Sequence, residues 1–122
     1  MRAEGLRGHL DLLLLQVLSR EPGHGYAVIA ALRESSEGVL DLTEGAVYPA
    51  LHRLEDQGLL SSQWQPVGGR RRRIYAVTAS GQEALRSQRR DWRVLASAID
   101  GLLVPPGQGS GRRTPAIGGA GL

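Results

Sequence analysis

Apolar residues in the first half of the chain recur at the spacing of amphipathic helices. The i, i+3, i+4, i+7 pattern covers about residues 9–19 and stops at the helix-breaking sequence Glu21-Pro22-Gly23. A second helix is expected over about residues 25–34, and a third over about residues 44–57. The inward stripe of the third helix is expected to be Val47, Ala50, Leu51 and Leu54.

The residues at the ends of the third segment also favour a helix. Thr43 is a suitable N-cap, and Glu44 places a negative charge near the positive end of the helix dipole. Pro49 inside the segment normally costs about 3 kcal/mol or more, through a clash with the carbonyl of residue i−4. That residue is Gly45, which leaves room for local adjustment, and Gly58 is a natural C-cap.

The middle of the chain changes to the pattern of a β-hairpin. Residues 59–65 alternate loosely, and residues 73–77 are rich in strand-forming side chains. The sequence Pro66-Val67-Gly68-Gly69 is expected to form the turn between them. The hairpin would therefore carry its basic residues at and after its tip.

A long helix is predicted over about residues 80–103. Thr78 is a candidate N-cap, and Ser80 with Glu83 has the spacing of a capping box. Residues repeat along the helix at heptad spacing, with one polar position in the second seam. The first seam is Leu85, Trp92 and Ile99, and the second is Gln88, Leu95 and Leu102.

The composition is that of one ordinary globular domain and excludes several kinds of chemistry. The 122 residues are 41% hydrophobic and 22% charged. Cysteine is absent, which excludes disulfides and thiolate chemistry, and the three histidines form no close pair, so we expect no metal site. Because there is also no Gly-rich phosphate loop before a helix, we expect neither an enzyme nor a cofactor.

The charge is concentrated in one part of the chain. All 15 basic residues are arginine, and the net charge is only +3. Residues 68–93 contain eight arginines and two acidic residues, whereas residues 1–67 contain five arginines and nine acidic residues. A polyanion would therefore meet a local basic cluster.

The remaining features concern organisation and location. We expect a DNA-binding domain over residues 1–78, a dimerisation helix over residues 79–104 and a disordered Gly/Pro-rich tail over residues 105–122. No apolar run is long enough for a transmembrane helix, and the N-terminus lacks signal-peptide features. A cytoplasmic protein without membrane contact is therefore expected.

The order of these elements predicts a mainly α fold with a small β-hairpin. Three short helices followed by a hairpin describe a winged helix-turn-helix, here followed by a long C-terminal helix. In such a domain the third helix enters the DNA major groove, and arginines of the hairpin reach the flanking backbone or minor groove. Double-stranded DNA is therefore the expected partner.

Three sequence segments resemble the PadR family of bacterial transcriptional regulators. They are His24-Gly25-Tyr26, the run from Glu44 to Leu59 that contains Tyr48-Pro49, and the run from Gly69 to Gly81. The resemblance covers about residues 8–103 and implies a winged-helix repressor that dimerises through its C-terminal helix. It matches the smaller subfamily, which has a single such helix. Family members often have a proline in the Gly-Arg-x-Arg segment, whereas four arginines run together here.

The expected DNA contacts come from the second and third helices and the hairpin. They are Tyr26, Thr43, Glu44, Gly45, Tyr48, His52, Arg70, Arg71, Arg72 and Arg73. Three of these assignments have a structural alternative. Tyr26 can belong to the core, Tyr48 can pack beside Pro49, and the arginines can form a solvated turn.

A homodimer is expected because one small domain cannot cover the seam of the last helix. The expected interface residues are Leu12, Leu13, Leu85, Trp92, Leu95, Ile99 and Leu102. A planar aromatic or anionic effector is expected near the seam, at Gln88, Arg89, Trp92 and Arg93. The alternative for Trp92 is a purely structural anchor of the dimer.

The leading functional hypothesis is a DNA-binding repressor that a small molecule releases. The alternative is a small-molecule-binding dimer whose DNA binding is secondary or lost. The two differ in salt dependence, because arginine–phosphate contacts release counterions and a purely ligand-binding protein makes none.

Overall fold

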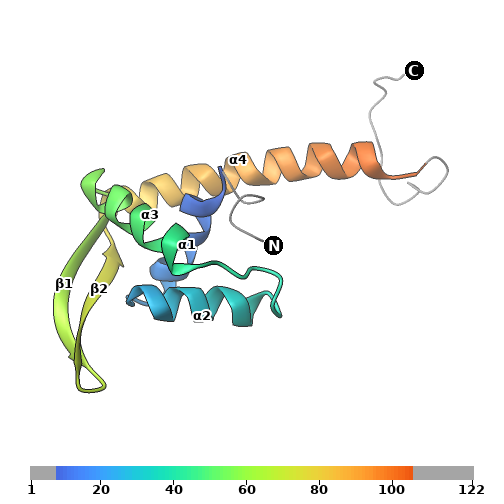
Figure 1. The fold of residues 1–122 in the computed structure, drawn as a ribbon. Coiled ribbons are helices and arrows are strands. Elements are labelled where there is room, and N and C mark those ends of the chain that lie inside the picture. The colour runs from blue at the N-terminus through green and yellow to red at the C-terminus, as the bar shows by residue number, and fades with distance from the viewer. Residues whose placement is uncertain (1–7, 106–122) are drawn as a thin grey trace. The chain divides into compact units, whose positions relative to one another are not determined.

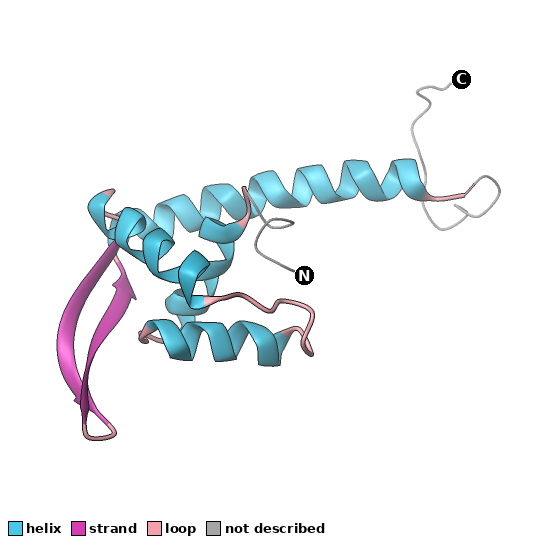
Figure 2. Ribbon diagram, viewed as in Figure 1, coloured by secondary structure: helices cyan, strands magenta, loops and turns pink. Residues whose placement is uncertain are grey.

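The structure, a computed structural model, describes residues 8–105 and is mainly helical with one antiparallel hairpin (Figures 1 and 2). The order and type of the elements confirm the predicted fold class. The elements are α1 (Leu10–Arg20), α2 (Gly25–Ser35), α3 (Glu44–Asp56), β1 (Leu60–Val67), β2 (Arg70–Val77) and α4 (Ala79–Leu103).

The chain divides into two compact units between Gln88 and Arg89. The boundary expected after residue 78 therefore falls earlier than the division in the structure, because the first turns of α4 belong to the unit that contains the other elements. Gly81 explains this attachment: a Cβ at this position would collide with the carbonyl of Leu59. The tail expected to be disordered lies, apart from Pro105, outside the described residues.

One hydrophobic core joins all the elements of the first unit. The helices place their apolar stripes in it as the periodicity predicts, and the hairpin contributes the side chains of Leu60 and Tyr75. Burial of each such side chain stabilises the fold by about 1.5–3 kcal/mol. The buried residues are Leu14, Leu15, Leu18, Val28, Ile29, Leu32, Leu42, Val47, Ala50, Leu51, Leu54, Leu60, Tyr75 and Leu85.

Side-chain caps fix the starts of α2 and α3. The Nδ1 atom of His24 accepts a hydrogen bond from the backbone N–H of Ala27, at 3.2 Å. The hydroxyl of Thr43 accepts one from the N–H of Ala46, at 3.3 Å, as its sequence position predicts. Helix α3 continues through Pro49 without interruption.

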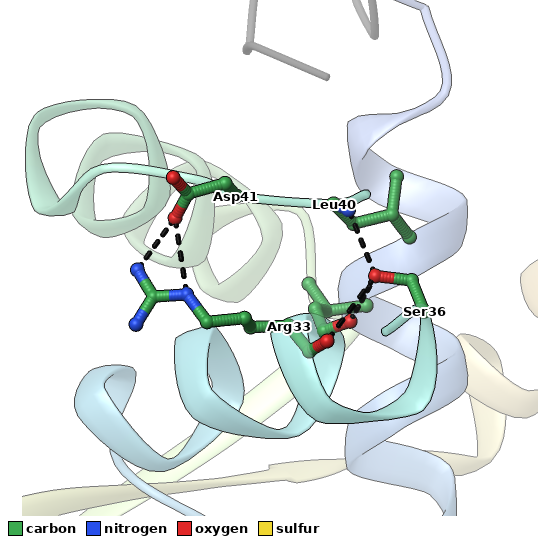
Figure 3. Close-up of polar contacts among 5 residues, drawn as sticks. Arg33, Ser36, Leu40 and Asp41 are labelled. Carbon is green, nitrogen blue, oxygen red and sulfur yellow. Dashed lines mark hydrogen bonds and ion pairs between the residues drawn. The ribbon is translucent and has the colours of Figure 1, made fainter. Parts of the chain in front are cut away.

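The linker between α2 and α3 is held by polar contacts of two side chains, Ser36 and Arg33 (Figure 3). The hydroxyl of Ser36 donates to the carbonyl of Leu32, at 2.7 Å, and accepts from the N–H of Leu40, at 2.8 Å. Arg33 donates to Asp41 through Nε and Nη2, and this pairing lowers the pKa of the Asp41 carboxyl. These contacts tie the linker to the end of α2 just before α3 begins.

The hairpin is longer than the sequence predicts, and its turn is shorter. Only Gly68 and Gly69 form the turn, with φ angles of +58° and +81°. Positive φ at both central positions is what a two-residue hairpin turn requires, and glycine provides it without strain. The expected turn over Pro66–Gly69 is therefore wrong. Pro66 is accommodated within β1 because both strands of a two-stranded sheet are edges.

The start of α4 also differs in one detail from the prediction. Thr78 is the cap, because its hydroxyl accepts from the N–H of Gly81 at 3.0 Å and donates to the carbonyl of Gly58 at 2.6 Å. Ser80 already lies inside the helix. The predicted capping box of Ser80 and Glu83 is therefore wrong, and Glu83 instead lies 3.5 Å from Arg86 in an exposed ion pair.

Candidate nucleic-acid interface

Helix α3 has one buried face and one face open to solvent. Its inward stripe packs in the core, and Thr43, Glu44, Gly45 and His52 are all exposed, as expected for groove-facing residues. Side chains at the N-terminal end and along the outer face of such a helix are the ones that reach base edges in helix-turn-helix proteins. The exposed face of α3 is therefore available to read DNA.

Tyr48 lies at the border between the two faces of α3. Its side chain is half-buried and packs against the core, and its ring lies over Gly25 at the start of α2. A Cβ at residue 25 would lie 2.5 Å from Cζ of Tyr48 and 2.7 Å from its hydroxyl oxygen. The absence of a side chain at Gly25 thus makes room for the Tyr48 ring.

Arg53, one residue beyond His52, is engaged within the protein. Its guanidinium donates two hydrogen bonds to the Asp11 carboxylate, at 2.8 and 2.9 Å, and this pairing raises the pKa of Arg53. The two-point contact joins α3 to the first turn of α1. Arg53 therefore helps to hold α3 against α1.

Tyr26 brings α2, α3 and the hairpin together on the surface. Its side chain is 49% exposed, so the alternative that it belongs to the core is wrong. The guanidinium carbon of Arg72 lies 5.2 Å from the centre of its ring. Interaction with the nearby Glu44 carboxylate raises the pKa of Tyr26. Arg72 of the β1–β2 hairpin, which is the wing of the fold, is thereby linked to the N-terminal end of α3.

The register of the hairpin separates the four arginines into two pairs. Trp64 lies opposite Arg73, and Gln65 lies opposite Arg72. Because side chains alternate along a strand, Arg71 and Arg73 share the Trp64 face, whereas Arg70 and Arg72 lie on the other face. The guanidinium carbons of Arg71 and Arg73 lie 5.4 and 5.6 Å from the centre of the Trp64 ring.

Arg73 is also held by polar groups at the base of the hairpin. Its Nε donates to the Ser62 hydroxyl at 2.8 Å, and its Nη2 lies 3.5 Å from the Glu55 carboxylate. The Ser62 hydroxyl in turn donates to Glu55 at 2.7 Å. This network attaches the wing to the last turns of α3, and it partly neutralises Arg73.

The sequence analysis missed the contacts of Trp64 with Arg71 and Arg73, although the signal for them was present. With Gly68-Gly69 as a two-residue turn, counting back along both strands places Trp64 opposite Arg73. The four-residue turn inferred from Pro66 shifts this register and hides the pairing. The cap formed by His24 was also missed, because histidine is not among the usual N-cap residues.

The residues expected at the dimer seam fall into two groups. Leu85 is completely buried in the core of the chain, so it offers no surface to a partner, which corrects its assignment. Leu12 and Leu13 of α1 are partly buried. The side chains further along α4 are exposed, namely Trp92, Leu95, Ile99 and Leu102.

The residues expected to contact an effector all lie on α4. Gln88 and Arg89 are partly buried, and Trp92 and Arg93 are exposed.

Within residues 8–105, no group of three or more His, Asp or Glu side chains is arranged to hold a metal ion. None of the helices in the described part of the chain has the length and apolar character needed to cross a membrane.

Comparison with known proteins identifies related sequences and structures. The chain is 41% identical over 88 residues to the transcriptional regulator Rv3488 of Mycobacterium tuberculosis, a match that covers 72% of this chain and 66% of that protein. It is 30% identical over 92 residues to the transcriptional regulator YqjI of Escherichia coli, covering 75% of this chain and 43% of YqjI. The chain thus spans only part of the length of these curated relatives.

A solved structure and a family description agree with these relatives. The PadR family transcriptional regulator from Eggerthella lenta superimposes with a TM-score of 0.71 at 37% identity, covering 83% of this chain and 87% of that one. Residues 14–87, which include every element from α2 to β2, match the transcriptional regulator PadR-like family. The chain therefore belongs to the PadR-like family, whose members are DNA-binding transcriptional regulators and not enzymes.

Proposed function

We propose that the protein is a sequence-specific repressor that binds double-stranded DNA as a homodimer. In this proposal α3 lies in the major groove and the β1–β2 hairpin contacts the adjacent backbone. The observation that carries the proposal is the Tyr26 contact, in which a wing arginine and the N-terminal end of the recognition helix meet at one exposed ring. It supports a single DNA-facing surface built from α2, α3 and the wing.

Sequence preference would come from the exposed face of α3. Glu44 is the most informative side chain there, because a carboxylate only accepts hydrogen bonds and is repelled by phosphates. In the major groove a carboxylate can accept from the amino group of cytosine. We infer that Glu44 reads a cytosine in each half-site, and that Thr43, Gly45, Tyr48 and His52 set the register of the helix.

Non-specific affinity would come mainly from Arg70, Arg71 and Arg72. Arg70 and Arg71 are exposed, and Arg72 is partly so. Each contact with a phosphate displaces counterions and steepens the salt dependence of binding. Arg73, which pairs with Glu55, would serve more to hold the wing than to contact DNA.

The test begins with genome-wide mapping of binding sites, which yields an operator for measurements in solution. Binding to that operator is expected to fall steeply with salt, and Arg71→Ala with Arg72→Ala should lower the slope by about 1 per lost phosphate contact. Glu44→Gln should change the preferred base at one position of each half-site. Absence of salt-dependent binding to DNA would contradict the proposal and favour a ligand-binding protein whose DNA binding is secondary or lost.

Dimerisation would use the exposed stripe of α4 together with α1. An open groove of about 430 Å³ between α1 and α2 has Leu13, Val17, Val28 and Leu32 among its lining residues. Partly buried apolar side chains such as Leu12 and Leu13 are suited to receive a partner helix. We therefore propose an interface of Leu12 and Leu13 with Trp92, Leu95, Ile99 and Leu102.

Release from DNA would require an effector, for which the proposed site is the segment of α4 from Gln88 to Arg93. Trp92 can stack on a planar aromatic compound, and Arg89 and Arg93 can attract an anion. A Trp64→Phe variant is titrated with planar aromatic and anionic compounds, and its tryptophan fluorescence then reports on Trp92 alone. Quenching that parallels operator release would support this site, and release that survives Trp92→Leu would contradict it.

As a regulator of chromosomal DNA, the protein would act in the cytoplasm.

A further inference from the structure

Trp64 occupies an unusual position for a large aromatic residue. It lies in the middle of β1 on the exposed wing, and 53% of its surface is open to solvent. The guanidinium groups of Arg71 and Arg73 both lie against its ring, within 6 Å of the ring centre. At such distances a cation is attracted to the face of an indole.

The two arginines differ in what else they contact. Arg73 is bonded to Ser62 and pairs with Glu55, so its position does not depend on the indole. Arg71 is exposed and forms no ion pair with any residue between positions 8 and 105. The contact with Trp64 is therefore the interaction that restricts the Arg71 side chain.

A free arginine on a strand samples many rotamers and loses that freedom when it binds a phosphate. A ring that already holds the guanidinium reduces this loss, which is the general advantage of preorganisation. We propose that Trp64 is a positioning residue for DNA binding and acts through Arg71. This inference rests on the proposed function and makes Arg71 the wing residue that Trp64 prepares for a backbone phosphate.

The opposite face of the wing supplies a matched control. Arg72 lies 5.2 Å from the ring centre of Tyr26, a separation close to that of Arg71 from Trp64. The two arginine–aromatic pairs share neither a side chain nor a face of the hairpin. Substitution of Tyr26 should therefore weaken DNA binding by the same factor whether or not Arg71 is present.

The experiment is a double-mutant cycle on the full chain with the mapped operator. Trp64→Leu should weaken binding about two- to fivefold for each wing in contact with DNA. Its salt slope should remain that of the wild type, because no charge is removed. Arg71→Ala should lower the slope by about 1 per wing. When Arg71→Ala is already present, Trp64→Leu should cause no further loss, whereas Tyr26→Leu should cause its full loss.

Two more variants separate positioning from a structural role. Trp64→Phe retains a ring and should recover most of the affinity. Arg71→Lys leaves Trp64 untouched and keeps the charge but not the planar group, so it should reproduce the loss of Trp64→Leu with an unchanged slope. Thermal melting of each variant checks that the wing remains folded.

An equal loss from Trp64→Leu with and without Arg71 would overturn the inference, since the indole would then act directly or through folding. Full affinity in Trp64→Leu would overturn it as well. The proposed function fails in a different way, namely if the wild-type protein itself shows no salt-dependent DNA binding.

Discussion

Three consecutive residues at the start of α2 contribute in three different ways. His24 caps the helix, Gly25 makes room for the ring of Tyr48, and Tyr26 contacts Arg72 of the wing. The first of these contacts fixes the start of α2, the second lets α2 approach α3, and the third connects α2 to the hairpin. The sequence His24-Gly25-Tyr26 therefore connects the helices α2 and α3 with the hairpin.

Substitution of Gly25 tests the close approach of α2 and α3. Gly25→Ala should destabilise the protein by about 1–3 kcal/mol, because the new methyl group would displace the Tyr48 ring. The free energy of unfolding in urea measures this. Gly45→Ala is the control: its nearest neighbour would be the Thr43 hydroxyl at 3.9 Å, so stability should be unchanged or rise. Equal losses in both variants would contradict the packing argument.

The cap formed by His24 should make stability depend on pH. Burial, and then the charge of Arg72, lower the pKa of His24 from its usual 6.5. The folded state thus favours the neutral ring, whose Nδ1 accepts the bond from Ala27. This contribution is present above pH 6.5 and is lost as the pH falls through the lowered pKa of the folded state.

The variant His24→Asn retains a capping oxygen that does not titrate in this range. Its stability in urea at pH 7.5 should be close to that of the wild type. At pH 5 the wild type should lose up to about 1 kcal/mol, the usual energy of an N-cap, relative to the variant. Parallel losses in the two proteins between these pH values would show that the cap is not responsible.

At the scale of elements, local signals determined what the sequence could predict. The apolar stripes of α1 to α3 and the cap at Thr43 are encoded by neighbouring residues, so those helices were predicted to within about two residues. The hairpin register follows from the two-residue turn at Gly68 and Gly69, a signal that Pro66 obscured by suggesting a longer turn. The contact between Tyr26 and Arg72 joins distant segments, and the sequence left the place of Tyr26 open.

Thr78 links the start of α4 to the turn after α3, and its substitution tests which cap starts α4. Thr78→Ala should cost about 1–2 kcal/mol, because the Gly81 N–H loses its acceptor and the Gly58 carbonyl its donor. Thr78→Ser retains the hydroxyl and should remain within about 0.5 kcal/mol of the wild type. Ser80→Ala should also have little effect on the melting temperature. If Ser80→Ala lowers stability more than Thr78→Ala does, then α4 starts with the capping box of Ser80 and Glu83 after all.

At the scale of the whole molecule, the distribution of exposed side chains separates two tasks. The surface formed by α2, α3 and the hairpin carries Arg70, Arg71 and Arg72, whereas the part of α4 beyond Gln88 carries exposed apolar residues beside its own arginines. Trp92, Leu95, Ile99 and Leu102 recur at intervals of three and four and so form one stripe along the helix. In the proposed homodimer this apolar stripe would pack against a helix of the partner.

A charge on this stripe should therefore separate the subunits and leave each one folded. In the variant Leu95→Arg with Ile99→Arg, association would bury uncompensated charge, at a cost of about 3–5 kcal/mol for each charge. Sedimentation equilibrium should then show monomers with the helical circular dichroism of the wild type, since neither residue belongs to the hydrophobic core. Their melting temperature should be lower, because the stabilisation by association is lost. Operator affinity should fall steeply, because a monomer contacts only one of two half-sites, which lie about 34 Å apart.

Val94→Arg adds a charge to an exposed side chain outside the stripe and should leave the dimer intact. If Val94→Arg dissociates the protein as strongly as the double variant, or the double variant remains dimeric, then the stripe is not the interface.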